Sequence, residues 1–258
     1  MATILHDTVR VERDGALAIV TIDHPPANAI SRAVVAGITQ ALVEAEADER
    51  CRAMVITGAG PRFFAAGADI GEFASAGGDT IASAQELTLA MERSRLPIVA
   101  AVNGIAFGGG CELTLACDVR IASSTARFGQ PEIKLGIIPG WGGTQRLPRL
   151  IGRAVATELL FSGDPVEASR ALDLGIVARV VEPEALAEAA RALASRFAAQ
   201  APLAMAATKR AIADGSDRPL AEGLEAERRE FVSLFSSEDA REGITAFLEK
   251  RPPMWTGR

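Results

Sequence analysis

Hydrophobic and polar positions along this chain follow two alternating patterns. Short runs of β-branched and other apolar residues predict buried strands, at 17–22, 53–57, 98–102, 119–122 and 176–181. Between the first two runs, Ser31 can cap a helix with the apolar stripe Val35, Ile38, Leu42 and Ala45. Residues 80–94 predict a second helix. Strands and helices therefore alternate in this part of the chain.

This alternation predicts an α/β fold, because strand–turn–helix units recur at intervals of roughly 20 to 45 residues. From residue 184 onward the pattern becomes helical, with candidate helices at 184–199, 202–214, 219–235 and 238–250. Pro202, Gly215 and Pro219 punctuate these segments. We predict a core domain over 1–196 and a helical C-terminal region over 197–258. Periodicity alone does not separate a spiral of ββα units from a doubly wound sheet.

Composition and charge narrow the class of protein. Of the 258 residues, 48% are hydrophobic and 23% charged, which is ordinary for a soluble globular protein. The net charge of −6 and the absence of a Lys/Arg run argue against nucleic acid as the main partner. No run of about 18 apolar residues exists, so we expect no membrane span. The first residues lack the basic and apolar regions of a signal peptide.

The few cysteines and histidines exclude several kinds of site. Cys51, Cys111 and Cys117 form an odd set without dense spacing, which indicates a reducing compartment rather than a disulfide framework. Cys111 and Cys117 lie six positions apart in an apolar helix, where core packing is expected rather than metal binding. His6 and His24 are the two histidines, and no tyrosine is present. A Ser–His–Asp triad and a histidine-rich metal site are therefore poorly supported, and we predict no metal.

Two glycine-rich strand-to-helix turns carry the most informative pattern. The first is FAAGADI over 64–70, and the second is NGIAFGGGCEL over 103–113. Each presents backbone N–H groups where side chains are small, and two such turns facing each other can form an oxyanion hole. The run from Gly108 to Gly110 could instead cradle a phosphate at a helix N-terminus. It lacks the lysine and hydroxyl residue of a nucleotide loop, and no G-x-G-x-x-G fingerprint follows.

Two glutamates accompany the turns. Glu112 begins an otherwise apolar helix, where a carboxylate is also favoured by the helix dipole alone. Glu132 follows Pro131, and by itself it would fit an exposed loop carboxylate. An oxyanion hole that polarises a carbonyl group, placed beside two carboxylates, indicates proton transfer next to an activated acyl group. Burial would raise the pKa of Glu112 and prepare it to carry a proton near neutrality.

These turns and glutamates, together with the stretch LGIIPGWGGTQRL over 135–147, resemble the enoyl-CoA hydratase (crotonase) family. The resemblance resumes, in order, within 168–177 and 242–251. It implies a crotonase-like spiral of ββα units with a helical C-terminal region. It also implies reversible addition of water to a trans-2-enoyl-CoA, giving a 3-hydroxyacyl-CoA in fatty acid metabolism. Coenzyme A would be the thioester carrier of the substrate, with no further cofactor.

The resemblance assigns roles to particular residues. Glu112 and Glu132 would hold one water, one removing its proton and the other delivering a proton to the α-carbon. Ala68 and Gly109 match the oxyanion-hole donors.

Gly140 stands where related isomerases and dehalogenases often carry an aspartate, so a water can fit there and hydration is favoured. Trp141 replaces the small residue of some close hydratases, and it fits either core or subunit-interface packing or a wall of the acyl pocket.

The resemblance also implies residues that bind CoA and the assembly that brings them together. Ala27, Ala66 and Asp69 match positions around the nucleotide part, and Ile70 in the same turn is assigned to substrate binding. Phe247 and Lys250 match positions that reach CoA from a neighbouring subunit, although a solvated amphipathic helix would explain them equally well. We expect a homotrimer or a dimer of trimers, hence a hexamer, in the cytoplasm.

Three alternatives remain at this stage. A Δ3/Δ2-enoyl-CoA isomerase would need only one well-placed carboxylate, and a thioester hydrolase of the same family is a further possibility. A catalytically silent fold could act as a binding or RNA-associating module. The two glutamates, Gly140 and the acidic balance favour the hydratase. Acyl chain length and physiological direction are not determined by these patterns.

Overall fold

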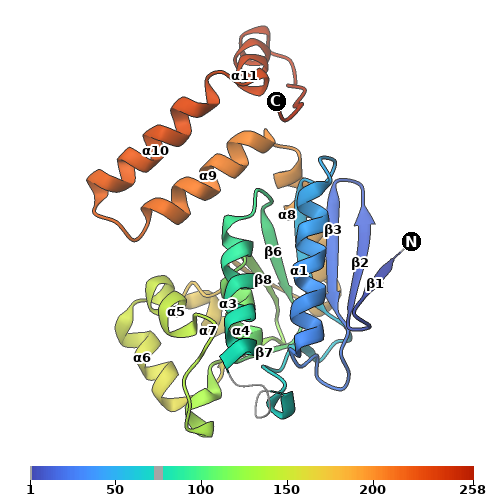
Figure 1. Ribbon diagram of the computed structural model, residues 1–258, viewed down its shortest axis with the longest axis vertical. Coiled ribbons are helices and arrows are strands. Elements are labelled where there is room, and N and C mark those ends of the chain that lie inside the picture. The colour runs from blue at the N-terminus through green and yellow to red at the C-terminus, as the bar shows by residue number, and fades with distance from the viewer. Residues whose placement is uncertain (1, 73–77) are drawn as a thin grey trace.

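The computed structural model describes residues 2–72 and 78–258 and has a mixed α/β fold built on two sheets (Figure 1). In the seven-stranded sheet the order is β1-β2-β3-β4-β6-β8-β11, antiparallel up to β3 and parallel from β3 onward. Its strands are β1 (Thr3–Leu5), β2 (Val9–Asp14), β3 (Leu17–Ile22), β4 (Ala53–Gly58), β6 (Ile98–Val102), β8 (Val119–Ser123) and β11 (Arg179–Val181).

A second sheet of four short strands has the order β10-β9-β7-β5. These are β5 (Phe63–Ala65), β7 (Ile105–Phe107), β9 (Arg127–Gly129) and β10 (Val166–Glu167). Successive pairs β4/β5, β6/β7 and β8/β9 each place one strand in the large sheet and the next in the small one. Helix α3 (Gly78–Arg93) follows the first pair, and α4 (Gly109–Leu115) follows the second. The predicted spiral of ββα units is confirmed.

In the large sheet, strands β3, β4 and β6 are buried on both faces, as a parallel sheet covered by helices must be. In β3, Ala18, Val20 and Ile22 face the main core, while Leu17 and Ile19 face a second apolar cluster. Helix α1 (Arg32–Ala47) buries the predicted stripe against the main core, and Ser31 Oγ accepts the Val34 N–H at 3.3 Å as its N-cap. Helix α8 (Leu186–Ala198) covers the opposite face.

The last predicted strand is partly wrong. Ile176 and Val177 are buried in the core, but the strand begins only at Arg179, where pairing with Ile121 of β8 starts. The N–H groups of Ile176 and Val177 donate instead to Ala171 O, in the turn after α7 (Ala168–Asp173). A run of apolar residues indicates burial, but it does not indicate which of them pair with a neighbouring strand.

The predicted helices agree with the structure to within a few residues. Besides α1, α3 and α8, these are α9 (Pro202–Gly215), α10 (Leu220–Leu234) and α11 (Glu238–Glu249). The chain also forms α5 (Gly143–Ile151) and α6 (Arg153–Ser162), which were not predicted, and the 3₁₀ turns η1 (Pro131–Leu135) and η2 (Pro183–Ala185). None of the helices within the described ranges has the length and apolar content needed to cross a bilayer.

The last three helices project from one end of the sheet-containing body (Figure 1). They expose large apolar side chains, among them Phe231, Phe235, Ile244 and Phe247. The domain boundary at residue 197 stays a prediction. Helix α8 continues across it to Ala198, and both Phe197 and Ala198 pack on the same cluster as the large sheet.

Candidate active site

A cavity of about 820 Å³ opens beside the small sheet. Its wall is formed by residues from the loop after β5, the start of α4, the turn η1, and the loop that leads into α5. Eight of the residues predicted from the sequence line it: Ala66, Ala68, Ile70, Gly109, Glu112, Glu132, Gly140 and Trp141. The structure therefore gathers most of the predicted site into one place.

Three neighbouring parallel strands explain this convergence. Strand β5 pairs in parallel with β7, and β7 pairs in parallel with β9. The carboxyl ends of parallel strands share one edge of a sheet, where ligands of open α/β folds commonly bind. From this edge emerge the segments 66–68, 108–109 and 130–132. These short strands were not among those predicted from the sequence.

The two glycine-rich turns lie next to each other at this edge. Gly108 has φ +51°, and a Cβ on Gly110 would lie 2.2 Å from Ala65 O, so α4 can start this close to β5 only with glycine there. Within the described residues, neither the Ala68 nor the Gly109 N–H donates to another protein group. Gly109 opens a helix, where backbone donors have no partner within the helix. Two such N–H groups can stabilise an oxyanion.

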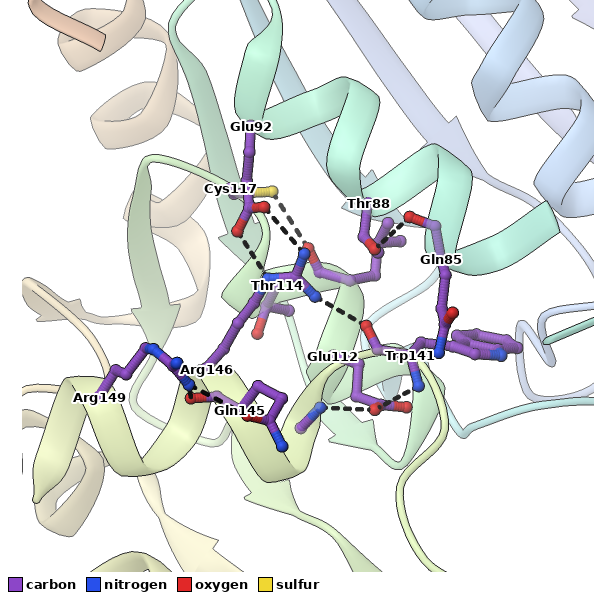
Figure 2. Close-up of polar contacts among 12 residues, drawn as sticks. Gln85, Thr88, Glu92, Glu112, Thr114, Cys117, Trp141, Gln145, Arg146 and Arg149 are labelled. Atoms are coloured by element: carbon purple, nitrogen blue, oxygen red, sulfur yellow. Dashed lines mark hydrogen bonds and ion pairs between the residues drawn. The ribbon is translucent and has the colours of Figure 1, made fainter. Parts of the chain in front are cut away.

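Glu112 is buried and held by the backbone. Its Oε1 accepts the Trp141 N–H and the Gly143 N–H, each at 2.7 Å (Figure 2). Burial raises the pKa of Glu112, while these two hydrogen bonds and the charge of Arg146 act in the opposite direction. The carboxylate therefore has a fixed position and donors that favour its charged form, as a general base requires.

Glu132 lies on η1 with its side chain toward the same cavity. Burial, with repulsion from Glu112, raises the pKa of Glu132 from 4.5 to about 7. The amide of the fully buried Gln130 lies beside it; with nitrogen toward the carboxylate, it donates to Oε1 at 3.1 Å and to Oε2 at 3.3 Å. A group with this pKa can give or accept a proton near neutrality.

Trp141 packs in the core and also lies at the cavity. Its side chain is 5% exposed and belongs to the main core, and it also lines the cavity. The indole lies against the second glycine-rich turn, because a Cβ on Gly109 would be only 2.1 Å from its Cζ3. Packing around the indole and the position of the turn are therefore linked.

Four predicted binding residues do not line the cavity. Ala27 lies beside it, and its carbonyl accepts the Ala66 N–H at 3.1 Å. The Asp69 carboxylate accepts the N–H groups of Gly71 and Glu72, so it caps a turn.

The other two, Phe247 and Lys250, belong to the α11 region, at the end of the molecule opposite β7 and α4 (Figure 1). A single chain does not bring them to the cavity.

The sequence analysis assigned no role to several polar side chains around this site. Arg146 and Gln85 contact the loop before α5, Glu92 pairs with Arg146, and Gln130 contacts Glu132 (Figure 2 shows the first three). Arg146 stands inside the motif 135–147 that carried the resemblance, and Gln130 lies two positions before Glu132. Glu92 and Gln85 lie in α3, and nothing in its amphipathic pattern marks them.

The cysteines have no place in this chemistry. All three are free and buried, and burial raises the pKa of Cys111 and of Cys117 to about 12. Such thiols stay protonated and act as small apolar groups. Among the described residues there is no group of three or more His, Cys, Asp or Glu side chains arranged to hold a metal ion.

Comparison with known proteins gives consistent matches. The family model for enoyl-CoA hydratase/isomerase matches residues 12–258. A probable enoyl-CoA hydratase of Bacillus subtilis (strain 168) is 44% identical over 250 residues, covering 95% of this chain and 96% of that protein. A short-chain-enoyl-CoA hydratase of Clostridium acetobutylicum is 41% identical over 252 residues, with the same coverage of 95% and 96%. The crystal structure of an enoyl-CoA hydratase from Bacillus anthracis has a TM-score of 0.93 at 36% identity, covering 97% of this chain and 100% of that one.

Proposed function

The chain belongs to the enoyl-CoA hydratase/isomerase family, and we propose that it works as a hydratase through the cavity described above. It is an enzyme that adds water reversibly to a trans-2-enoyl-CoA and gives a 3-hydroxyacyl-CoA. Coenzyme A carries the acyl group as a thioester, and the reaction proposed here uses no other cofactor.

In the proposed reaction the thioester oxygen accepts hydrogen bonds from the Ala68 and Gly109 N–H groups. Attack of water at C3 pushes electrons from the C2–C3 double bond onto this oxygen, giving an enolate-like charge. Two unused donors at the edge of a buried turn stabilise that charge without reorganising. Loss of one such donor typically lowers kcat by about 10²–10³-fold.

The two glutamates complete the proton balance. Glu112, held as an acceptor by two backbone N–H groups, takes a proton from the attacking water as its oxygen bonds to C3. Glu132, with a pKa of about 7, gives a proton to C2 as the enolate collapses. Water has then added across the double bond, Glu112 has gained one proton and Glu132 has lost one, and transfer of one proton from Glu112 to Glu132 restores the starting state. Gly140 has no side chain to exclude the water.

Binding of the CoA part extends the proposal beyond one chain. Ala27, Ala66, Asp69 and Ile70 lie on or beside the turn after β5, where the CoA part would extend away from the thioester toward its nucleotide end. Phe247 and Lys250 lie too far away in their own chain and would reach CoA in a neighbouring subunit. Exposed apolar residues on α10 and α11 support a homotrimer or a dimer of trimers. We place this enzyme in the cytoplasm.

A single observation carries the function: two carboxylates line one cavity with two N–H groups that find no partner in the part of the chain that the structure describes. The test follows the enoyl-thioester absorbance with crotonyl-CoA for the wild type, Glu112→Gln and Glu132→Gln. Each variant should lose at least about 10²-fold in kcat while KM stays close to wild type. A folded variant that hydrates at the wild-type rate would remove that glutamate from the mechanism.

The isomerase reaction is the second candidate, because the matched family includes isomerases. It moves a double bond with one carboxylate as proton shuttle and consumes no water. Incubation with a 3-enoyl-CoA in the same assay distinguishes the two, since isomerisation makes the conjugated absorbance appear. A wild type that isomerises faster than it hydrates would overturn the hydratase assignment.

A further inference from the structure

The position of Glu112 depends on a loop whose own conformation is fixed by few of the loop's side chains. The loop 140–143 contains three glycines, and its Trp141 and Gly143 N–H groups hold Glu112 Oε1. Gly142, between these two donors, has φ +113°. A glycine-rich backbone has many accessible conformations, so something outside the loop must select this one.

Arg146 provides the contact on one side. Its Nη1 donates to Trp141 O at 2.7 Å, and a Cβ on Gly142 would lie only 2.1 Å from the same nitrogen. The guanidinium therefore lies directly against the turn that presents both donors to Glu112.

The far side of the guanidinium is fixed by Glu92 (Figure 2). Arg146 Nε donates to Glu92 Oε1 at 2.6 Å, and Nη2 donates to Oε2 at 2.9 Å. The Arg146 side chain is 16% exposed. A two-point pair of this kind sets the orientation of both planes as well as their distance, so Glu92 determines where Nη1 of Arg146 lies.

Helix α3 reaches the loop at a second point. Gln85 Nε2 donates to Gly140 O at 2.6 Å. Gln85 and Glu92 are seven positions apart, which is two helical turns and places them on the same face. We call Gln85, Glu92 and Arg146 the loop brace. Through it, α3 holds two carbonyl groups of the loop: Gly140 C=O, which shares a peptide with the Trp141 N–H, and Trp141 C=O, on the peptide between the two Glu112 donors.

We propose that Arg146, oriented by Glu92, is a positioning residue for hydration that keeps the Trp141 and Gly143 N–H groups on Glu112. This inference rests on the proposed function of Glu112. The brace touches neither the substrate oxygen nor the water, and it acts through the general base. A displacement of about 1 Å at such a position can cost about 10²-fold in rate.

Arg146 also affects Glu112 by its charge, because it holds the pKa of that carboxyl below the value that burial alone would give. The other ionisable groups near Glu112 are Glu132 on η1 and Cys111 on α4, with Glu92 behind Arg146. Strands β5 and β7, which also pack on α4, contain no ionisable residues. Removal of Arg146 should therefore raise the pKa of Glu112, and the acidic limb of the pH profile should move to higher pH.

The test compares Arg146→Gln, Arg146→Lys and Glu92→Gln with the wild type in crotonyl-CoA hydration. We expect Arg146→Gln to lower kcat by about 10²-fold with little change in KM, and to shift the acidic limb upward. Arg146→Lys keeps the positive charge but not the two hydrogen bonds to Glu92. The acidic limb of its pH profile should therefore stay near the wild-type position while kcat falls. The matched control is Arg149→Gln on the same helix, which breaks an exposed pair with Asp217 and should leave both quantities unchanged.

A double substitution separates positioning from general damage. In the Glu112→Gln background, Arg146→Gln should change the remaining rate by no more than about twofold, because its effect passes through Glu112. Equal losses in both backgrounds would overturn the proposal, and so would a folded Arg146→Gln enzyme with wild-type kcat and pH profile. If Arg146→Gln does not fold, Arg146→Lys and Glu92→Gln decide by the same criteria. Failure of the wild type to hydrate, or full activity of Glu112→Gln, would instead refute the proposed function.

Discussion

The contact between Gly109 and Trp141 allows a sharp test of the oxyanion hole. Gly109→Ala keeps the backbone N–H, and the φ of Gly109 is not in the left-handed region, so the backbone itself accepts alanine. The added methyl would lie 2.1 Å from Trp141 Cζ3 and 2.5 Å from Cε3. Carbon atoms in contact are normally at least about 3.5 Å apart. The indole or the turn must therefore move by about 1.4 Å.

The indole is poorly able to give way, because it is 5% exposed within the core. We expect the strain to cost about 1–3 kcal/mol in the free energy of unfolding, as overpacking does elsewhere. Displacement of the donor by about 1 Å should lower kcat by about 10²-fold. The measurement is crotonyl-CoA hydration beside a thermal unfolding curve.

Removing the indole provides the control for this reasoning. In Gly109→Ala/Trp141→Ala the methyl has space, so kcat should recover by at least about tenfold over Gly109→Ala. Trp141→Ala alone should cost about 3–5 kcal/mol in stability from the cavity left behind. A folded Gly109→Ala enzyme with wild-type kcat would refute the reasoning, and so would a double variant no more active than Gly109→Ala.

Two further predictions concern Glu132 and the C-terminus. The pKa of Glu132 is about 7 in the folded protein and 4.5 when unperturbed. Between pH 4.5 and 7 the folded state therefore binds more protons than the unfolded state. The free energy of unfolding decreases as pH rises through this range, because of this group. Glu132→Gln should therefore raise Tm relative to wild type at pH 8 but not at pH 4.5. An equal Tm difference at both pH values would contradict the raised pKa. In the wild type, the hydration rate should also decline above pH 7, because the proton donor ionises. Lys250→Ala should raise KM for CoA esters and leave KM for a truncated pantetheine thioester unchanged, whereas equal effects on both substrates would show that Lys250 does not contact the nucleotide end.

The sequence was most informative where one local property decides the outcome. Ser31 and the stripe from Val35 to Ala45 define α1, because capping and helical periodicity depend only on neighbouring residues. The strands at 17–22 and 98–102 were found with the correct bounds, because the sheet is buried on both faces there and every position except Thr21 is apolar. Ile176 and Val177 show the limit of this signal, since burial without ladder pairing gives the same pattern.

The small sheet could not be found in this way. Strands β5, β7 and β9 have three residues each, too few for a period to emerge, and their pairing joins segments about 40 and 20 residues apart. Yet these strands bring the two glycine-rich turns and Glu132 to one edge. The motif residues were recognisable from their order, while their proximity depends on this non-local pairing.

The sequence by itself determined the chemistry that is available: two glycine-rich turns, two glutamates, a glycine at position 140, and a helical C-terminal region. Only the tertiary structure decided how these groups are tuned. Burial raises the pKa of Glu132 to about 7, the loop before α5 supplies two N–H groups to Glu112, and α3 holds that loop through Gln85, Glu92 and Arg146. Residue types and local periodicity are carried by neighbouring positions, whereas desolvation and hydrogen-bond geometry arise from contacts between segments that only the folded chain brings together.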